Sequence, residues 1–251
     1  MRRSAASLTW LFVLLALVSA AYGRDGGREA KSAIEAAQAL GLYLDELAKA
    51  GKRPDYSKPP ASELFRHVFD TAALQALPAP RSADLDWLLA WGGAADQVYK
   101  RVLFFGMQPG QAPDPGTLSR NIAQYQDQHA AAVNFMIRLQ ARLTATIILF
   151  LEQLPTDQRT AGRAAGLQQS RAGAAQLIAG ALASIAQGMA PANARLVTAA
   201  LRDTRQTWAT YLQPADRGRI AALLVAMPKI DATAQQNLAA FADALAAANA
   251  K

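Results

Sequence analysis

The sequence has no cysteine and only two histidines among its 251 residues. Without cysteine, disulfide bonds, thiolate metal sites and cysteine nucleophiles are excluded. The histidines, His67 and His129, are far apart in the chain, and no HExxH pattern is present, so the usual zinc motifs are excluded as well. We therefore expect no metal or cofactor site, and a fold that is stabilised by packing alone.

Sequence motifs for catalysis and for phosphate binding are also missing. The chain has neither a GxSxG elbow nor an SxxK motif. Its glycine-rich stretch, residues 162–180, lies within a helical pattern and lacks the lysine and the hydroxyl residue of a phosphate-binding loop. Paired carboxylates remain open as acid–base catalysts, because such pairs can be distant in sequence. No catalytic residue is identified, and a binding protein is favoured over an enzyme.

The N-terminus carries an apolar run, residues 8–18, that follows Arg2 and Arg3 and precedes small residues. This order is typical of a secretory signal peptide, with cleavage expected after Ala20 or after Gly23. The run is shorter than the roughly 20 residues that span a bilayer, although an uncleaved anchor remains an alternative. We expect residues 1–23 to be a signal peptide and the protein to be exported to the periplasm or the extracellular space. No later apolar run predicts a transmembrane span.

The remainder, residues 24–251, predicts a single all-α domain. Alanine, leucine and glutamine dominate, β-branched residues are sparse, and prolines fall between periodic segments, which is the pattern of helices joined by short turns. We expect a bundle of about seven to nine helices. Its N-terminal half would be residues 24–113, and its C-terminal half residues 114–251.

The longest predicted helix runs from Asp114 to Leu154 and would lie at the centre of the bundle. Asp114 can cap it, Pro115 suits its first turn, and no further proline occurs before Pro155. Its apolar face recurs at alternating steps of four and three residues. The positions are Leu118, Ile122, Tyr125, His129, Ala132, Met136, Leu139, Leu143, Thr146 and Phe150. The pattern predicts one helix roughly 60 Å long.

The helix predicted after Pro155 contains Gly162, Gly166, Gly173 and Gly180. Each glycine inside a helix costs about 1 kcal/mol relative to alanine. Small residues allow two helix backbones to approach closely. We therefore expect a second helix to pack tightly against these glycines.

Positive charge is concentrated in the C-terminal half. Between residues 138 and 219 there are ten arginines, no lysine and four acidic residues, a net charge of +6. Arg138 with Arg142, and Arg159 with Arg163, are two pairs at i,i+4 spacing on the helices before and after Pro155. If those helices are antiparallel, the four guanidinium groups would share one surface, where they could bind phosphates or carboxylates. The alternative is a set of solvated helix faces.

A second candidate site combines aromatic residues with a histidine. Trp87 and Trp91 are four residues apart, so their rings share a helix face, and Tyr99 follows on the same helix. His129 occupies the apolar face of the longest helix. These four side chains could line a ligand pocket between helices. Alternatively, they are core residues whose polar atoms are satisfied internally.

The sequence thus predicts an exported, non-enzymatic helical protein that binds an anionic envelope component or a partner protein. The alternative is a small-ligand-binding protein or enzyme with a pocket near Trp87, Trp91, Tyr99 and His129. No nucleic acid partner is expected, because export separates the protein from it and no aromatic residues alternate with the basic ones.

Overall fold

The computed structural model describes residues 26–107, 114–158 and 160–249. Throughout these ranges the regular secondary structure is helical and includes no strand, which confirms the all-α prediction. The predicted signal peptide, residues 1–23, and Arg159 lie outside the described residues.

The described ranges contain helices α1 to α11 and two short 3-10 turns. The N-terminal elements are α1 (Gly26–Lys49), α2 (Ala61–Val68), α3 (Thr71–Ala76), η1 (Ser82–Asp84) and α4 (Leu85–Leu103). The middle elements are α5 (Pro115–Gln124), α6 (Gln126–Gln153), η2 (Thr156–Gln158) and α7 (Ala161–Ala186). The C-terminal elements are α8 (Pro191–Asp203), α9 (Arg205–Tyr211), α10 (Pro214–Val225) and α11 (Ala232–Asn249). The structure has more helices than the seven to nine expected for this part of the chain. One reason is that a break at Tyr125 divides the predicted helix Asp114–Leu154, and another is that a break at Thr204 separates α8 from α9.

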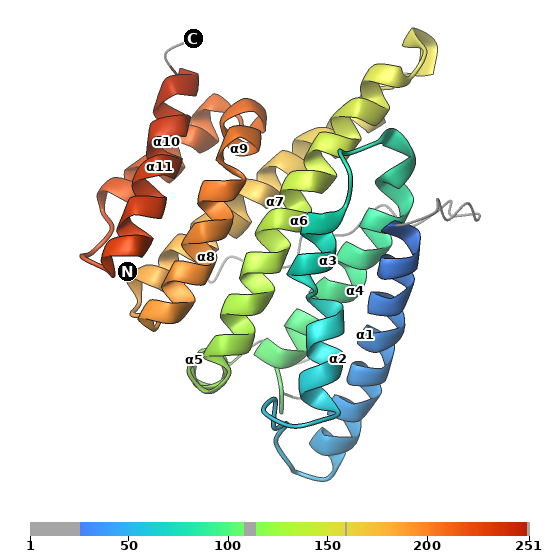
Figure 1. Ribbon diagram of the computed structural model, residues 1–251, viewed down its shortest axis with the longest axis vertical. Coiled ribbons are helices and arrows are strands. Elements are labelled where there is room, and N and C mark those ends of the chain that lie inside the picture. Colours follow the sequence, from blue (N-terminus) through green and yellow to red (C-terminus); the bar gives the residue numbers. More distant parts are fainter. Residues whose placement is uncertain (1–25, 108–113, 159, 250–251) are drawn as a thin grey trace.

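Helix α6 lies in the middle of the bundle (Figure 1). It packs against α3 and α4 of the N-terminal group on one side, and against α7 and α8 on the other. The N-terminal group is held together mainly by α1, which packs along α2 and α4, and the C-terminal group by α11, which packs along α8 and α9. The long helix of the sequence pattern therefore occupies the expected central place.

The expectation of one unbroken helix from Asp114 to Leu154 was wrong, because the helix breaks at Tyr125. The backbone of Tyr125 leaves the helical region, with φ −112° and ψ 36°. Asp114 caps α5 as predicted, accepting from the backbone N–H of Thr117 at 2.8 Å. The buried Asn121 amide donates to the carbonyls of Leu103 at 2.8 Å and Phe105 at 3.0 Å, which fixes α5 against the end of α4. This tertiary contact accompanies the change of direction between α5 and α6, and a heptad pattern does not encode it.

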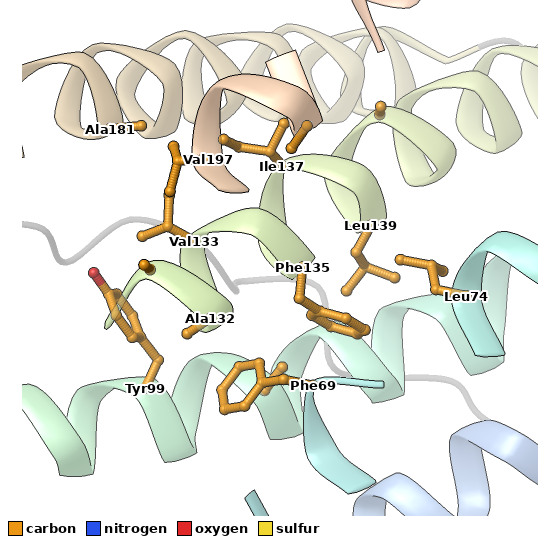
Figure 2. Close-up of a cluster of buried hydrophobic side chains, with 14 of the residues drawn as sticks. Phe69, Leu74, Tyr99, Ala132, Val133, Phe135, Ile137, Leu139, Ala181 and Val197 are labelled. Carbon is orange, nitrogen blue, oxygen red and sulfur yellow. The ribbon is translucent and has the colours of Figure 1, made fainter. Parts of the chain in front are cut away.

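The hydrophobic core is built on both sides of α6 (Figure 2). Phe135 is fully buried and packs with Trp91 at 5.2 Å and edge-on to Phe69 at 5.7 Å between ring centroids. Val133 and Ile137 are also buried and lie on the opposite side, toward α7 and α8. By length and composition α6 is apolar enough to cross a membrane, but 61% of its most apolar window is covered by neighbouring helices, as in the core helix of a bundle.

The glycines of α7 do not serve the close packing that we expected, at least at two positions. A methyl group added at Gly180 would meet no atom within 4 Å, and one at Gly162 would meet only Thr160 Oγ1 at 4.0 Å. A glycine that does allow close approach lies elsewhere, at Gly26, where an added Cβ would be 2.5 Å from the indole of Trp87. Among the described residues, Gly162 and Gly180 therefore lower the helix propensity of α7 without a packing reason.

Candidate functional site

The tryptophans of the predicted ligand site are core residues. Trp91 is fully buried on α4, and its indole Nε1 donates to the carbonyl of Val68 at 2.9 Å. Trp87, one turn earlier, is also buried and packs against Gly26. Both rings pack α4 against its neighbours, and the indole Nε1 of Trp87 is buried without a hydrogen-bond partner among the described residues.

Tyr99 and His129 are brought together by the packing of α4 against α6. The Tyr99 hydroxyl and Nδ1 of His129 are 2.9 Å apart, and Nε2 of His129 lies 3.2 Å from the Ser184 hydroxyl on α7. The order Ser184, His129, Tyr99 has the form of a nucleophile, a base and an orienting group. However, Ser184 lies within α7, where the backbone N–H groups are committed to helical hydrogen bonds and cannot bind an oxyanion. The contacts satisfy both nitrogens of a buried imidazole, and we interpret them as structural.

His129 should make the stability of the protein depend on pH. Burial lowers the pKa of its imidazole, whereas a histidine in the unfolded chain titrates near its ordinary value of about 6.5. As the pH falls below that value, the unfolded state binds a proton that the folded state does not, and the free energy of unfolding decreases. We expect His129→Gln to flatten this decrease between about pH 7 and pH 5, as measured by urea unfolding.

His67 provides the control for this experiment. It is exposed on α2. His67→Gln removes the other histidine of the chain by the same substitution and shows whether the effect is specific to His129. If His129→Gln keeps the wild-type slope, the imidazole of His129 is not the group responsible.

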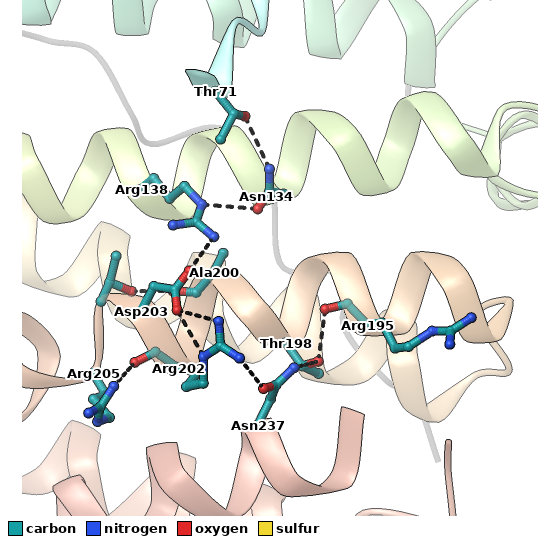
Figure 3. A network of polar contacts seen from close by, with 11 residues as sticks. Thr71, Asn134, Arg138, Arg195, Thr198, Ala200, Arg202, Asp203, Arg205 and Asn237 are labelled. Atoms are coloured by element: carbon teal, nitrogen blue, oxygen red, sulfur yellow. Dashed lines mark hydrogen bonds and ion pairs between the residues drawn. The ribbon is translucent and has the colours of Figure 1, made fainter. Parts of the chain in front are cut away.

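The predicted anion-binding residue Arg138 lies inside a polar network between helices (Figure 3). Its side chain is 11% exposed. Its Nε donates to Asn134 Oδ1 at 3.1 Å, and its Nη2 donates to Asp203 Oδ2 at 2.8 Å. Asn134 in turn donates to the hydroxyl of Thr71 at 3.1 Å. Arg138 therefore joins α3, α6 and α8 within the protein.

The same network continues through Asp203 to α11 (Figure 3). Asp203 also accepts from Nε and Nη2 of Arg202, at 2.8 and 2.7 Å. Arg202 donates to Asn237 Oδ1 at 3.0 Å, and Asn237 donates to the hydroxyl of Thr198 at 3.2 Å. Partial burial acts to raise the pKa of Asp203, but hydrogen bonds from Arg138 and Arg202 outweigh it and lower the pKa.

Arg142 and Arg163 are placed differently from each other. Arg142 is 12% exposed, donates to the carbonyl of Pro78 at 2.6 Å, and lies 3.7 Å from the buried carboxylate of Asp84. Arg163 is exposed, donates to the carbonyl of Gln158 at 2.5 Å, and lies 6.0 Å from the centroid of the Phe150 ring. Of the three predicted arginines that the structure describes, two have carboxylate partners inside the bundle, and Arg163 is at the surface.

A hollow that sequence reasoning missed lies beside the helix break at Tyr125. It has a volume of about 390 Å³. One wall is formed by residues 54–57, which belong to the connector between α1 and α2 (residues 50–60). The other wall is formed by Gln124, Tyr125 and Gln128. Little in the sequence indicates this site, because the connector has no periodicity and Tyr125 fits the apolar pattern of an unbroken helix.

Within the described ranges, no three histidine or acidic side chains gather where they could hold a metal ion. Comparisons with protein-family models, with curated proteins and with solved structures give no match. Two surface features of the described residues therefore stand out, the end of α6 near Arg163 and the hollow beside Tyr125.

Proposed function

We propose that this chain is an exported, non-enzymatic binding protein that docks on an anionic lipid surface of the envelope. The proposed contact is the hairpin tip, which we define as residues 147–158 and 160–167, where α6 and α7 are joined. In Figure 1 this end of the two helices projects beyond the rest of the bundle.

The observation that carries the proposal is the apolar end of α6. Residues Ile147, Ile148, Leu149, Phe150 and Leu151 are consecutive, so they cover every side of the helix, and all of them are partly exposed. A helix that is apolar on all sides is normally covered. A continuous apolar surface that is surrounded by polar residues is typical of protein or membrane interaction sites.

Positive charge beside this apolar surface favours an anionic lipid surface. The exposed guanidinium group of Arg163 lies over the ring of Phe150, and Arg159 is four residues before Arg163 in the sequence. Apolar side chains together with arginine are the combination that binds at the interface of anionic bilayers. Glu152 and Asp157 lie on the same hairpin tip and offset Arg159 and Arg163 in net charge, so we expect the attraction to be local to the arginines and easily screened by salt.

We expect the protein to co-sediment with vesicles that contain phosphatidylglycerol, and to bind less as the salt concentration rises. The double substitution Ile148→Ser and Leu149→Ser should weaken vesicle binding about 10-fold, because it removes apolar contact area. Arg163→Gln should reduce the salt dependence of binding. The measurement is a co-sedimentation titration at two salt concentrations.

Two exposed residues away from the hairpin tip serve as controls. Val225→Ser removes an 89% exposed apolar side chain on α10, and Arg219→Gln removes an exposed arginine paired with Asp216. Both should bind vesicles as the wild type does. The lipid proposal is overturned if binding is the same at low and high salt, or if only an acidic protein and no vesicle is bound.

A further inference from the structure

The segment that joins α3 to α4 runs beside the C-terminal half of α6, up to the hairpin tip. We name its residues 77–83 the shoulder. The Arg142 guanidinium group donates to the carbonyl of Pro78 at 2.6 Å, and the Ser82 hydroxyl donates to the side-chain carbonyl of Gln153. Arg142 and Gln153 are eleven residues apart on α6, which is about 16 Å of helix. The shoulder therefore follows α6 from Arg142 to a residue of the hairpin tip.

The first half of the shoulder offers apolar side chains and few backbone donors. It consists of Leu77, Pro78, Ala79 and Pro80, of which Pro78 and Ala79 are exposed and the other two are partly buried. Neither proline has a backbone N–H, and the carbonyl of Pro78 is already bonded to Arg142. Backbone polar groups without partners are costly to move from water into lipid. This loop therefore gives up fewer hydrogen bonds to water at a bilayer interface than an ordinary loop does.

The charge of the shoulder has the sign that an anionic bilayer attracts. Arg81 is its single charged residue, and the side chain of Arg81 is 57% exposed. The neighbouring carboxylate of Asp84 is 2% exposed, so it faces the interior of the bundle and not a docking surface. Basic residues next to a membrane surface attract anionic lipids. The shoulder thus combines apolar side chains with an exposed cation, as the hairpin tip does.

The shoulder is held in one conformation by contacts within the chain. The Asp84 carboxylate accepts from the backbone N–H of Arg81 at 3.1 Å and from its Nη2 at 2.9 Å, which fixes the start of η1. Helix α6 packs against η1, and Arg142 holds the carbonyl of Pro78. Because these residues are already ordered, docking them on a surface costs little conformational entropy.

We infer that the shoulder is a second contact with the same anionic bilayer on which the hairpin tip docks, so that α6 meets the bilayer obliquely and not end-on. This inference rests on the proposed lipid docking and adds a surface outside the hairpin tip. A bilayer is a plane, so the end of α6 and a segment along one side of it reach the bilayer together only when the helix is tilted. Two linked contacts also bind more tightly than either one alone.

Single cysteines carrying an environment-sensitive fluorophore test this arrangement, because the chain has no cysteine of its own. The variants are Ala79→Cys in the shoulder, Ala164→Cys in the hairpin tip, and Ala192→Cys in the first turn of α8, at the opposite end of the α6–α7 hairpin. All three alanines are exposed. With vesicles that contain phosphatidylglycerol, we expect the emission to shift to the blue at positions 79 and 164, which leave water, and to stay unchanged at position 192.

A charge substitution measures how much the shoulder contributes to binding. Ala79→Glu should weaken co-sedimentation with these vesicles about 5-fold, because it places a negative charge at an anionic surface. Ala192→Glu is the matched control, since it makes the same change at an exposed alanine far from the shoulder, and it should bind as the wild type does. Thermal unfolding should show that neither change lowers the melting temperature, because both positions are at the surface.

The outcomes separate the shoulder from the hairpin tip. A blue shift at position 164 without one at position 79 overturns the shoulder contact and leaves the docking of the hairpin tip in place, and so does equal vesicle binding by Ala79→Glu and Ala192→Glu. A shift at position 79 alone contradicts docking by the tip, and with it the arrangement of two contacts. No shift at either position and no co-sedimentation overturn the lipid docking itself.

Discussion

Replacing Asp84 by alanine should lower the free energy of unfolding by about 3–5 kcal/mol, because it removes one partner of a buried ion pair. The Asp84 side chain is 2% exposed and accepts from the backbone N–H of Arg81 at 3.1 Å and from its Nη2 at 2.9 Å. Its other neighbour, Arg142, is 12% exposed, and burial already lowers the pKa of that guanidinium group. Without Asp84 this charge would remain in the bundle near Arg81, with the carbonyl of Pro78 as its hydrogen-bond acceptor among the described residues.

Urea unfolding of Asp84→Ala, with Glu46→Ala as the control, measures this effect. Glu46 pairs with Lys49 at 2.8 Å, nearly the same distance as Asp84 with Arg81, but both side chains of that pair are more than 70% exposed. The control should lose less than about 1 kcal/mol. Similar losses of unfolding free energy in the two variants would show that burial does not determine how much the Asp84–Arg142 pair contributes to stability.

Trp91→Ala should also destabilise the protein strongly, by about 3–5 kcal/mol. The indole is fully buried, packs against Phe135, and donates to the carbonyl of Val68, so its loss leaves a cavity and a buried carbonyl without its donor. Thermal or urea unfolding measures the change. If Trp91 instead served mainly to bind a ligand, the free protein would lose much less stability.

Leu42→Ala is the matched control for Trp91→Ala. Leu42 is a large apolar residue that is 70% exposed on α1, so its truncation leaves no cavity. It should change the free energy of unfolding by less than about 0.5 kcal/mol.

The fold class was predictable because helix periodicity and proline placement are local signals. The break at Tyr125 was not predictable, because it goes together with the contact of Asn121 with the carbonyls of Leu103 and Phe105. That contact joins segments distant in sequence. A heptad pattern records only which residues are apolar. Tyr125 is buried at the break and would also be buried in a continuous helix, so its place in the pattern does not reveal the break.

The role of the arginines was harder to predict for the same reason. Arg138 and Arg142 share a helix face by their spacing, as expected, but the carboxylates that pair with them come from α8 and from the turn before α4. The spacing of arginines within one helix does not show which acidic residue from another part of the chain will lie next to them in the fold. The hollow at Tyr56 and Tyr125 likewise depends on how the connector packs, and the sequence carries no periodic signal for it.

Arginine is the cation in the ion pairs that join helices of the bundle. These ion pairs are therefore sensitive to a change of pH in one direction only. A guanidinium group stays protonated well into the alkaline range, whereas a carboxylate gives up its charge in acid. The ion pairs of Asp203 with Arg138 and Arg202 therefore tolerate alkaline conditions and lose the charge of the carboxylate only toward acid. The neutral imidazole of His129 is disfavoured in the same direction. Acidification thus opposes several helix contacts at once, and lysine at the same positions would have left the bundle vulnerable on the alkaline side as well.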